Sequence, residues 1–495
     1  MSSDPPPSTS AETSLPSSSG GAGSGARRPD PHVIVLFGAG GDLAARKLIP
    51  GFFHLQAAGL LPEEWRLVGT ADQDYDDDSF REHAHDVIEK YGRHGELDKA
   101  DFEGFHRRLS YVPVSAGANA LHTKVSEARA AIGTDCRLLH YLAVPPPAFG
   151  AITETLSSIG LTGPESRVIM EKPFGHDYES AVELNNLLHS VFKESQIFRI
   201  DHFLGKESVQ NVLALRFANG LFEPNWNRNN IEMVQIDVPE TLDVGNRAGF
   251  YEGTGAYRDM IVTHLLQALS FVAMEPPAAL DAKHLRDEKQ KVFDSIKPIQ
   301  PDDVIRGQYE GYRDIEGVPA DSDTETFAAV RVEVDNWRWA GVPFYLRTGK
   351  CLARSGHLVA LDFREPPMNM FPGEVQHQGA NQLVFEFSEP GSITADFQAK
   401  VPGPTLELGP ATMTFRYEES FAAENQLEAY ERLIHDAMIG DSTLFTTADG
   451  IERLWEVSAP ALDNPNPVIP YEQGSWGPKQ ADELLAPFEW RLNSA

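Results

Sequence analysis

Cysteine, positive charge and long apolar runs are all scarce in this chain. Among 495 residues only Cys136 and Cys351 are cysteines, too few for a disulfide framework, which favours a reducing cytoplasm. Lys and Arg number 42 against 73 Asp and Glu, so the formal net charge of −31 excludes the broad basic surface that nucleic acids require. No stretch approaches the ~20 consecutive apolar residues of a membrane helix. We therefore expect a cytoplasmic protein with neither a nucleic-acid nor a membrane partner.

The first 30 residues also have little that could be buried. Ser, Pro, Gly and Ala dominate residues 1–30, which predicts a disordered tail. The whole chain is 41% hydrophobic and 23% charged, which is ordinary for a globular protein. Any site for a phosphate must therefore be a local basic island in an acidic molecule.

Short apolar runs alternate with amphipathic segments from His32 to about Ile200. The apolar runs predict strands at Val33–Phe37, Arg66–Gly69, Leu109–Val112, Leu138–Val144, Val168–Met170 and Ile197–Ile200. The segments between them predict helices, among them Leu43–Ala58, Ser79–Lys90, Ala118–Ala131, Phe149–Ser158 and Tyr178–Val191. This alternation predicts an α/β domain with a doubly wound parallel sheet, a Rossmann domain over residues 31–204.

The pattern changes beyond Gly205. Val234, Ile236 and Val238 alternate with polar residues, and two later segments do the same, which predicts an antiparallel sheet. Apolar helical stretches at Met260–Met274 and Ala429–Met438 could cover its buried face. We expect residues 205–495 to form a larger α+β domain.

A glycine-rich turn follows the first predicted strand. It comprises Gly38, Ala39, Gly40, Gly41, Asp42 and Leu43. Glycines let the backbone approach a pyrophosphate at a helix N-terminus, where free N–H groups favour anions. Leu43 stands where the third glycine of the G-x-G-x-x-G pattern would be, so an ordinary strand-to-helix turn stays open. The position at the start of an α/β pattern favours a dinucleotide site.

Two clusters of polar residues could carry chemistry. The segment Arg199–Glu207 (RIDHFLGKE) places an acid, an imidazole and an ammonium at the carboxyl end of a predicted strand, where ligands of doubly wound sheets bind. Asp259 and His264 lie five apart on an otherwise apolar helix. From the residues alone, the first cluster could be an ion-paired loop, and His264 is more often a core histidine than a base. Lys172 and Lys350 stand beside turn residues, where most lysines are simply exposed.

Taken together, these segments resemble the glucose-6-phosphate dehydrogenase family over nearly the whole chain. The matching motifs are Gly38–Pro50 (GAGGDLAARKLIP), Glu171–Asp177 (EKPFGHD), Arg199–Glu207 (RIDHFLGKE), Val342–Lys350 (VPFYLRTGK), Glu428–Phe445 (EAYERLIHDAMIGDSTLF) and Tyr471–Pro478 (YEQGSWGP). The resemblance implies oxidation of D-glucose 6-phosphate at C1 to 6-phosphogluconolactone, with a hydride passed to NAD(P)+, the first step of the oxidative pentose phosphate pathway. It also implies a homodimer or homotetramer formed through the large sheet.

The resemblance assigns roles to individual residues. His264 matches the general base, and Asp201 the carboxylate that orients it. The residues that match substrate contacts are Lys172, His202, Lys206, Glu240, Asp259 and Lys350. Those that match cofactor contacts are the six residues of the glycine-rich turn, Asp72 and Lys172. Pro173 matches a cis-proline, and no metal is implied.

Four positions depart from the family's pattern. Phe203 stands where the family usually has a tyrosine whose hydroxyl contacts the sugar phosphate, so we expect a weaker but real preference for the phosphorylated sugar. Thr263 replaces an asparagine before the catalytic histidine, and the second basic residue after Lys350 comes one place early, as Arg354. Asp72 stands where an arginine usually grips the 2′-phosphate of NADP.

The acidic residue at position 72 predicts that NAD is used at least as well as NADP. After the second strand of a Rossmann domain, a carboxylate hydrogen-bonds the ribose diol of NAD, whereas arginine accepts the 2′-phosphate of NADP. Two alternatives stay open. Arg46 and Lys47 could turn toward the phosphate and restore NADP binding, or the acidic run could be a solvated loop with the match displaced by one residue.

Two other functions compete with this one. A sugar oxidoreductase of the glucose–fructose oxidoreductase type also pairs a Rossmann domain with an E-K-P turn and an antiparallel sheet. The DHFLGK motif and the long C-terminal region disfavour it. An inactive dinucleotide sensor would keep the fold alone, but Asp201, His264 and the substrate lysines are intact. The sequence leaves regulation by a partner protein undetermined.

Overall fold

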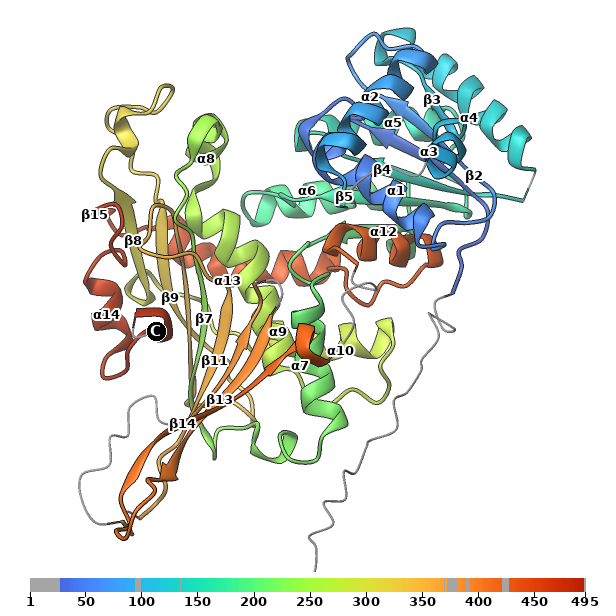
Figure 1. Ribbon diagram of the computed structural model, residues 1–495. Helices are drawn as coiled ribbons and strands as arrows, with labels where there is room; N and C mark the ends of the chain where they lie inside the picture. Colours follow the sequence, from blue (N-terminus) through green and yellow to red (C-terminus); the bar gives the residue numbers. More distant parts are fainter. Residues whose placement is uncertain are drawn as a thin grey trace, which may run out of the picture.

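A computed structural model of the chain describes residues 27–93, 99–133, 135–368, 370–371, 381–388, 391–420 and 427–493. Two lobes lie side by side, each built on its own sheet (Figure 1). The tail expected over residues 1–30 falls outside the described residues except for its last four positions.

The first lobe contains a six-stranded parallel sheet. Its strands are β1 (His32–Phe37), β2 (Trp65–Thr70), β3 (Leu109–Tyr111), β4 (Arg137–Leu142), β5 (Ser166–Glu171) and β6 (Ile197–Ile200). Their order is β3-β2-β1-β4-β5-β6, the doubly wound order expected from the alternating pattern. The order reverses beside β1, which is buried along its whole length because helices cover both faces. The predicted Rossmann fold is confirmed.

Helices connect these strands. They are the π-helix η1 (Ala44–Leu48), α1 (Ile49–Ala57), α2 (Asp77–Tyr91), α3 (Lys99–His106), α4 (Ala118–Ile132), α5 (Phe149–Ser158) and α6 (Tyr178–His189). Helices α2 and α6 each begin with a capping box, in which Asp76 pairs with Ser79 and Asp177 with Ser180. The sequence pattern predicts all of these helices except α3.

The second lobe contains a nine-stranded sheet. Its strands are β7 (Ile231–Pro239), β8 (Val304–Tyr309), β9 (Phe327–Glu333), β10 (Pro343–Gly349), β11 (Leu358–Phe363), β12 (Gln382–Glu386), β13 (Ser392–Lys400), β14 (Leu408–Arg416) and β15 (Ile469–Tyr471). Their order is β14-β13-β12-β11-β7-β10-β9-β8-β15. Antiparallel pairing dominates as expected, and the sheet is mixed because β7–β10 and β8–β15 are parallel.

Helices lie on both sides of the large sheet. They are α7 (Glu207–Ala218), α8 (Ala248–Ala256), the π-helix η7 (Tyr257–Leu265), α9 (Leu266–Ala273), α10 (Ala282–Ser295), α11 (Tyr417–Ser420), α12 (Ala429–Ile439), α13 (Ala448–Asp463) and α14 (Gln480–Leu485). Helices α7, α9, α10 and α13 lie on one side of the sheet, and α14 packs near β8 on the other (Figure 1). None of the helices in the described part of the chain has the length and apolar character that a membrane crossing requires.

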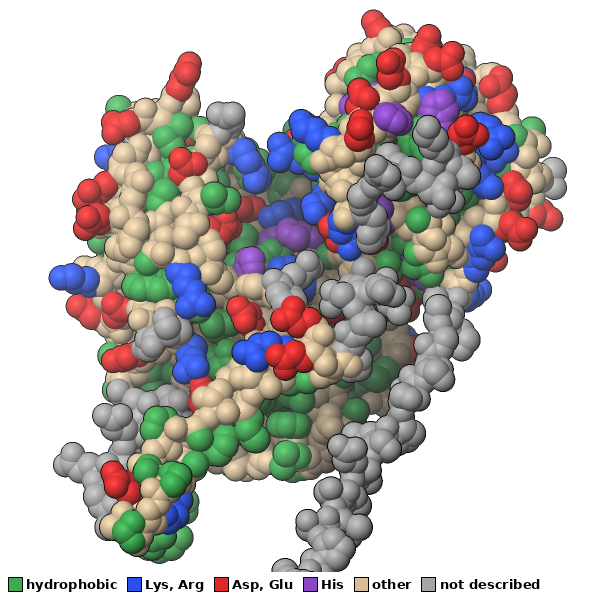
Figure 2. All heavy atoms as spheres, in the orientation of Figure 1, with side chains coloured by type: hydrophobic (Ala, Val, Ile, Leu, Met, Phe, Trp, Pro, Cys, Tyr) green, Lys and Arg blue, Asp and Glu red, His purple; other side chains and the backbone are tan. Residues whose placement is uncertain are grey.

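The C-terminal helices return to the first lobe. Arg167 on β5 donates from Nη1 to the carbonyl of Ala437 at 2.7 Å and also to that of Met438, at the end of α12. Trp455 on α13 donates its indole N–H to the carbonyl of Phe174 at 3.0 Å. These contacts hold the two lobes against each other. The space-filling view shows a hollow between them in which histidine, lysine and arginine side chains gather (Figure 2).

Candidate active site

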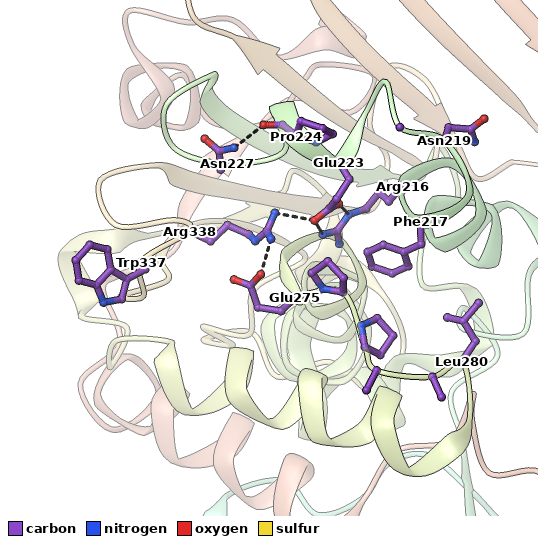
Figure 3. Close-up of a pocket in the computed structure, with 15 residues that line it drawn as sticks. Arg216, Phe217, Asn219, Glu223, Pro224, Asn227, Glu275, Leu280, Trp337 and Arg338 are labelled. Atoms are coloured by element: carbon purple, nitrogen blue, oxygen red, sulfur yellow. Dashed lines mark hydrogen bonds and ion pairs between the residues drawn. The ribbon is translucent and has the colours of Figure 1, made fainter.

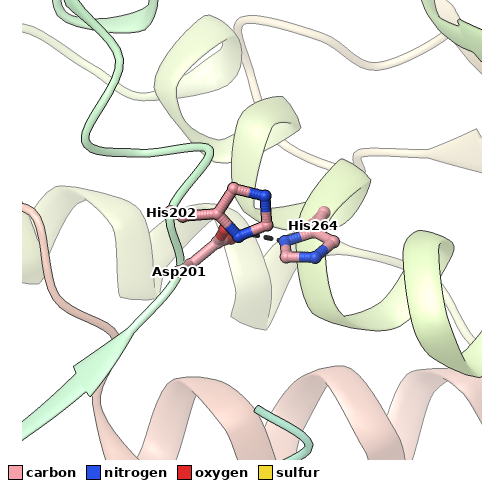
Figure 4. A group of neighbouring side chains, drawn as sticks. All are labelled: Asp201, His202 and His264. Atoms are coloured by element: carbon pink, nitrogen blue, oxygen red, sulfur yellow. Dashed lines mark hydrogen bonds and ion pairs between the residues drawn. The ribbon is translucent and has the colours of Figure 1, made fainter. Parts of the chain in front are cut away.

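A buried carboxylate–imidazole pair lies where the two lobes meet. Asp201 directly follows β6, and His264 lies on η7 (Figure 4). His264 Nδ1 is 2.7 Å from Asp201 Oδ1. An ionised carboxylate only accepts, so Nδ1 carries the hydrogen and Nε2 keeps its lone pair. The arrangement is that of a base oriented by an acid.

The π-helix explains the five-residue spacing of Asp259 and His264. Residues five apart lie about 140° apart around an ordinary α-helix, on different faces. In a π-helix the i→i+5 hydrogen bond brings such residues one turn apart on the same side. Segment η7 therefore turns both side chains toward the hollow, although the surrounding residues are apolar and buried.

The electrostatics of the pair favour an ionised Asp201. Burial is the largest single effect and raises the pKa of this carboxyl, but the attraction and hydrogen bond of His264, the attraction of His202 and the N–H of Phe203 together hold the pKa below its usual value. His264 Nε2 and Asp201 Oδ2 are both buried, and neither has a hydrogen-bond partner among the described residues. A buried acceptor left unpaired is costly unless a ligand satisfies it. Nε2 is therefore well suited to receive a substrate hydroxyl.

Two lysine–carboxylate pairs lie at strand ends near this base. Lys172 follows β5 and donates from Nζ to Asp259 Oδ1 at 2.9 Å. Lys350 follows β10 and pairs with Glu240, which follows β7. The peptide bond between Lys172 and Pro173 is cis, as predicted. Paired cations and carboxylates of this kind offer several donors and acceptors to sugar hydroxyls.

His202 and Lys206 lie beside the ring of Phe203, which stacks on His264. The ring of His202 lies 5.2 Å from that of His264 and stacks on Tyr430 of α12 at 5.9 Å. Burial, and then the charge of His264, lower the pKa of His202 to about 3, so its imidazole is neutral near pH 7. Lys206 Nζ reaches the carbonyl of Phe387 at 3.4 Å.

The structure adds residues to the site to which the sequence patterns assigned no role. Tyr141 donates to Glu171 at 2.6 Å, and Tyr430 also bonds to this carboxyl. Burial raises the pKa of Glu171 to about 7, against the lowering effect of these bonds. Lys289 on α10 is buried, which lowers its pKa to about 8 against the attraction of Asp201. Glu171 and Tyr430 stand inside the quoted motifs, but nothing in the sequence pointed to Lys289.

The glycine-rich turn fits a dinucleotide phosphate. Gly38 has φ +77°, and a Cβ built there would lie 2.2 Å from the carbonyl oxygen of Ala143. A Cβ at Gly40 would lie 2.4 Å from Gln73 Oε1. Gly38 is required by its positive φ and by the close backbone of Ala143, whereas at Gly40 the flexible side chain of Gln73 would have to move. The N–H groups that open the following helix η1 are then accessible to a pyrophosphate.

The residues considered for cofactor choice lie near this turn. Asp72 is exposed and stands two residues after β2. Arg46 lies 2.6 Å from Asp42 in an exposed ion pair, and Lys47 pairs with Glu428 at 3.0 Å. Both cations thus already have acidic partners, whereas Asp72 is an exposed carboxylate just after β2.

The other departures from the family's pattern also have a place in the structure. Phe203 stacks on His264 with ring centroids 4.5 Å apart. The hydroxyl of Thr263 donates back to the carbonyl of Asp259 within η7. Arg354 is exposed.

Three side chains of the site, Asp201, His202 and His264, lie close enough together to share a cation. One ligand atom from each of Asp201, His202 and His264 falls within 4.8 Å of the others. The hydrogen bond between Asp201 and His264 accounts for this closeness without an ion. The absence of a metal stays a prediction, which a metal analysis of the purified protein tests.

A pocket also lies away from the dyad. It has a volume of about 940 Å³ and lies between α7, the end of α9 and Trp337 (Figure 3). Its guanidinium groups are paired, Arg216 with Glu223 at 3.0 Å and Arg338 with Glu223 at 2.9 Å and with Glu275. None of the predicted site residues lines it, so volume alone does not identify the reactive centre.

Comparison with protein families identifies both lobes. The model described as "Glucose-6-phosphate dehydrogenase, NAD binding domain" matches residues 35–211, and "Glucose-6-phosphate dehydrogenase, C-terminal domain" matches residues 213–491. Glucose-6-phosphate 1-dehydrogenase of Rhizobium meliloti (strain 1021) is 40% identical over 480 residues, which cover 92% of this chain and 96% of that protein. The enzyme of Aggregatibacter actinomycetemcomitans is 41% identical over 478 residues, which cover 92% and 95%.

Solved structures agree. Glucose-6-phosphate 1-dehydrogenase from Mycobacterium avium superposes with a TM-score of 0.82 at 36% identity, covering 94% of this chain and 99% of that one. A glucose-6-phosphate dehydrogenase in complex with its substrate glucose-6-phosphate gives 0.86 at 33% identity, with the same coverage. A levoglucosan dehydrogenase reaches 0.50 at 11% identity over 88% of this chain and 97% of that one, which is a likeness of fold alone.

Proposed function

The chain belongs to the glucose-6-phosphate dehydrogenase family, and we propose that it oxidises glucose 6-phosphate at C1 to 6-phosphogluconolactone with a nicotinamide dinucleotide as oxidant. The observation that carries this proposal is the buried pair of His264 and Asp201. The Nε2 atom of His264 has no hydrogen-bond partner among the described residues. A sensor that had lost catalysis would have no need to keep this orphaned acceptor.

His264 performs the proton transfer in this proposal. Its Nε2 takes the proton of the C1 hydroxyl while the hydride leaves C1 and the C–O bond becomes a carbonyl. Asp201 accepts from Nδ1 throughout and stabilises the imidazolium that forms. When bound, the nicotinamide dinucleotide supplies the acceptor for the hydride. Atoms and charge balance, since one hydride and one proton leave the sugar.

The remaining site residues hold the sugar in this proposal. Lys172 and Asp259 form one ion pair near the base, and Lys350 and Glu240 form another. When the sugar binds, these four side chains can form hydrogen bonds to its hydroxyls in place of part of their bonding to each other. The resemblance puts His202 on the phosphate side and Lys206 near the reacting end. Because the ammonium of Lys206 lies 4.8 Å from the centroid of the Phe203 ring, we propose that Lys206 contacts the phosphate as well. Fixed donors and acceptors around a sugar hold C1 near the base, which is how orientation lowers the barrier.

NAD is the cofactor we propose to be used at least as well as NADP. Support comes from the exposed carboxylate of Asp72 after β2 and from the acidic partners of Arg46 and Lys47. A carboxylate about 4 Å from a 2′-phosphate would cost on the order of 4 kcal/mol per charge pair at an effective dielectric of 20, and less where water screens the charges.

A rate assay tests the proposed function. Reduced cofactor is followed with glucose 6-phosphate, with free glucose and with levoglucosan, each in the presence of NAD+ or NADP+. We expect rapid oxidation of glucose 6-phosphate and slow oxidation of the other two sugars. Oxidation of levoglucosan without oxidation of glucose 6-phosphate would favour the rival oxidoreductase class, and no turnover of any sugar would favour a sensor.

We also propose that the chain forms a cytoplasmic homodimer or homotetramer. Strands β13 and β14 stay half-exposed along most of their length, and Met413 on β14 is largely exposed, which is compatible with an interface there. The two cysteines are buried and free, as a reducing compartment favours. Light scattering after size exclusion measures the assembly, and a monomer would contradict it.

A further inference from the structure

Phe203 is the centre of a group of nitrogen-bearing side chains. Its ring stacks on His264 at 4.5 Å and lies 5.0 Å from the ring of His202. The ammonium of Lys206 lies 4.8 Å from the centroid of the same ring. A fourth side chain, His357, meets the ring edge-on at 5.6 Å. The first three belong to the site already described, whereas His357 comes from a segment that no motif included.

The main chain places His357 beside Lys206. His357 immediately precedes β11, and its carbonyl accepts from the N–H of Phe387 at 2.6 Å. The carbonyl of Phe387 in turn accepts from Lys206 Nζ at 3.4 Å. Phe387 thus bonds to the main chain of His357 and to the side chain of Lys206, which places the backbone of His357 near the ammonium group. His357 immediately precedes β11 and Phe387 immediately follows β12, so the contact extends the pairing of these two strands.

The imidazole of His357 is available for a ligand. Among the described residues no hydrogen bond reaches either of its ring nitrogens, and the side chain is half-buried. Burial, followed by repulsion from Lys206 and from His264 in its protonated form, lowers the pKa of His357 to about 4. Near pH 7 the ring is therefore neutral and carries one N–H donor. The charge that attracts an anion comes from Lys206.

We propose that His357 donates a hydrogen bond to the phosphate of glucose 6-phosphate, beside Lys206, and supplies the donor that Phe203 lacks. The inference rests on the proposed function and extends it to a residue outside the family's motifs. The rings of His202 and His357 and the ammonium of Lys206 all lie within 5.6 Å of the centroid of the Phe203 ring, so three groups that carry N–H donors gather around one phenyl ring. A tetrahedral dianion with three terminal oxygens matches such an arrangement, because each oxygen accepts separately.

The test compares phosphorylated and unphosphorylated sugar. His357→Leu replaces the imidazole by an apolar side chain without an N–H donor. In this variant we expect KM for glucose 6-phosphate to rise about tenfold to a hundredfold. The kcat at saturating glucose 6-phosphate and the kcat/KM for free glucose should stay close to wild type. His357→Gln retains an N–H donor and should recover part of the affinity. His122→Leu, an exposed histidine on α4, is the matched control and should change neither.

A double substitution adds a second readout. Phe203→Tyr restores the phenolic hydroxyl, so it should lower KM for glucose 6-phosphate more in the His357→Leu background than in the wild type. Inhibition by inorganic phosphate should weaken in His357→Leu in parallel with KM, since both anions use the same donor. The melting temperature of each variant identifies any loss of folding.

Several results would overturn the proposal. An equal loss of kcat/KM for glucose 6-phosphate and for free glucose would mean that His357 supports packing around Phe203. An unchanged KM in a folded His357→Leu would mean that the ring does not reach the phosphate. Failure of the proposed function can be told apart from failure of this inference, because in that case the wild-type enzyme itself would not oxidise glucose 6-phosphate.

Discussion

One hydrogen bond decides which nitrogen of His264 can act as the base. Asp201 Oδ1 takes the hydrogen of Nδ1 at 2.7 Å, which leaves the lone pair on Nε2. In His264→Asn the amide can still donate to Asp201, so the fold should persist, but no group remains to accept the hydroxyl proton. We expect kcat to fall about a hundredfold to ten-thousandfold with little change in KM.

Steady-state kinetics of purified His264→Asn and of the control His189→Asn check this result. His189 lies on α6 and pairs with Glu194 at 2.8 Å, well outside the dyad. Turnover of His264→Asn within a few-fold of wild type would show that His264 is a core histidine, the alternative that its apolar helix left open.

Asp72 is the residue on which cofactor choice turns. If its carboxylate contacts the ribose of NAD, Asp72→Arg should shift the ratio of kcat/KM for NADP over NAD upward by about tenfold to a hundredfold. Asp74→Arg is the matched control, because Asp74 is also exposed in the same loop. A wild-type enzyme that strongly prefers NADP would contradict the proposal. An equal shift in Asp74→Arg would show that the ratio responds to the net charge of the loop and not to a contact made by Asp72.

At the scale of single elements, the π-helix η7 is what makes the site possible. Its wide turns place Asp259 and His264 on one side, and Thr263 bonds back to the carbonyl of Asp259. Such a bond gives the irregular turn a partner for a carbonyl that an ordinary α-helix would satisfy differently. The threonine that departs from the family's pattern thus takes part in the helix geometry.

Removing that hydroxyl should weaken the element. Thr263→Val keeps the shape of the side chain, and we expect it to lower the free energy of unfolding by about 1 kcal/mol. We also expect a fall in kcat that is smaller than in His264→Asn, because the base is displaced rather than lost. Urea unfolding and kinetics measure both effects. Thr263→Ser keeps the hydroxyl and should retain most of the stability; a Thr263→Val enzyme as stable as wild type would show that the bond is unimportant.

Across the whole molecule, neutral histidines buried in the fold couple stability to pH. His140 on β4 is fully buried and donates from Nε2 to the carbonyl of Leu161 at 2.8 Å. Burial lowers its pKa to about 4, below the value of about 6.5 in an unfolded chain. The unfolded state therefore binds more protons at acid pH. Stability attributable to His140 is complete above about pH 6.5 and is lost as pH falls toward 4.

Replacement by a residue that does not titrate tests this coupling. His140→Gln can still donate to Leu161 but fills the site less well, so we expect a somewhat lower melting temperature at pH 7. The free energy of unfolding should fall less steeply between pH 6.5 and pH 4.5 than in the wild type. The slope removed should approach one proton, about 1.4 kcal/mol per pH unit. Equal slopes for wild type and variant would show that His140 is protonated in the folded state.

The local sequence determined the elements and the family. Alternating apolar runs predicted the six strands of the first sheet and their parallel order, because strands buried on both faces must be apolar throughout. Polar residues at the end of the sixth predicted strand made Asp201 a candidate, since ligands bind at the carboxyl ends of strands in such a sheet. Lys172 and Lys350 became candidates only through the resemblance to the family. These inferences depend on near neighbours in the chain, which a single sequence displays.

Only the tertiary structure decided which distant groups meet. A period of 3.6 residues cannot reveal that Asp259 and His264 share a face, because the widened helix depends on its surroundings. Nothing along the chain connects His357 with Phe203, which meet beside the paired strands β11 and β12. Nothing connects Lys289 with Asp201 either, and the two interact only because Lys289 is buried in the folded protein. The sequence named the candidate groups, whereas folding determined which of them are neighbours and how deeply each is buried.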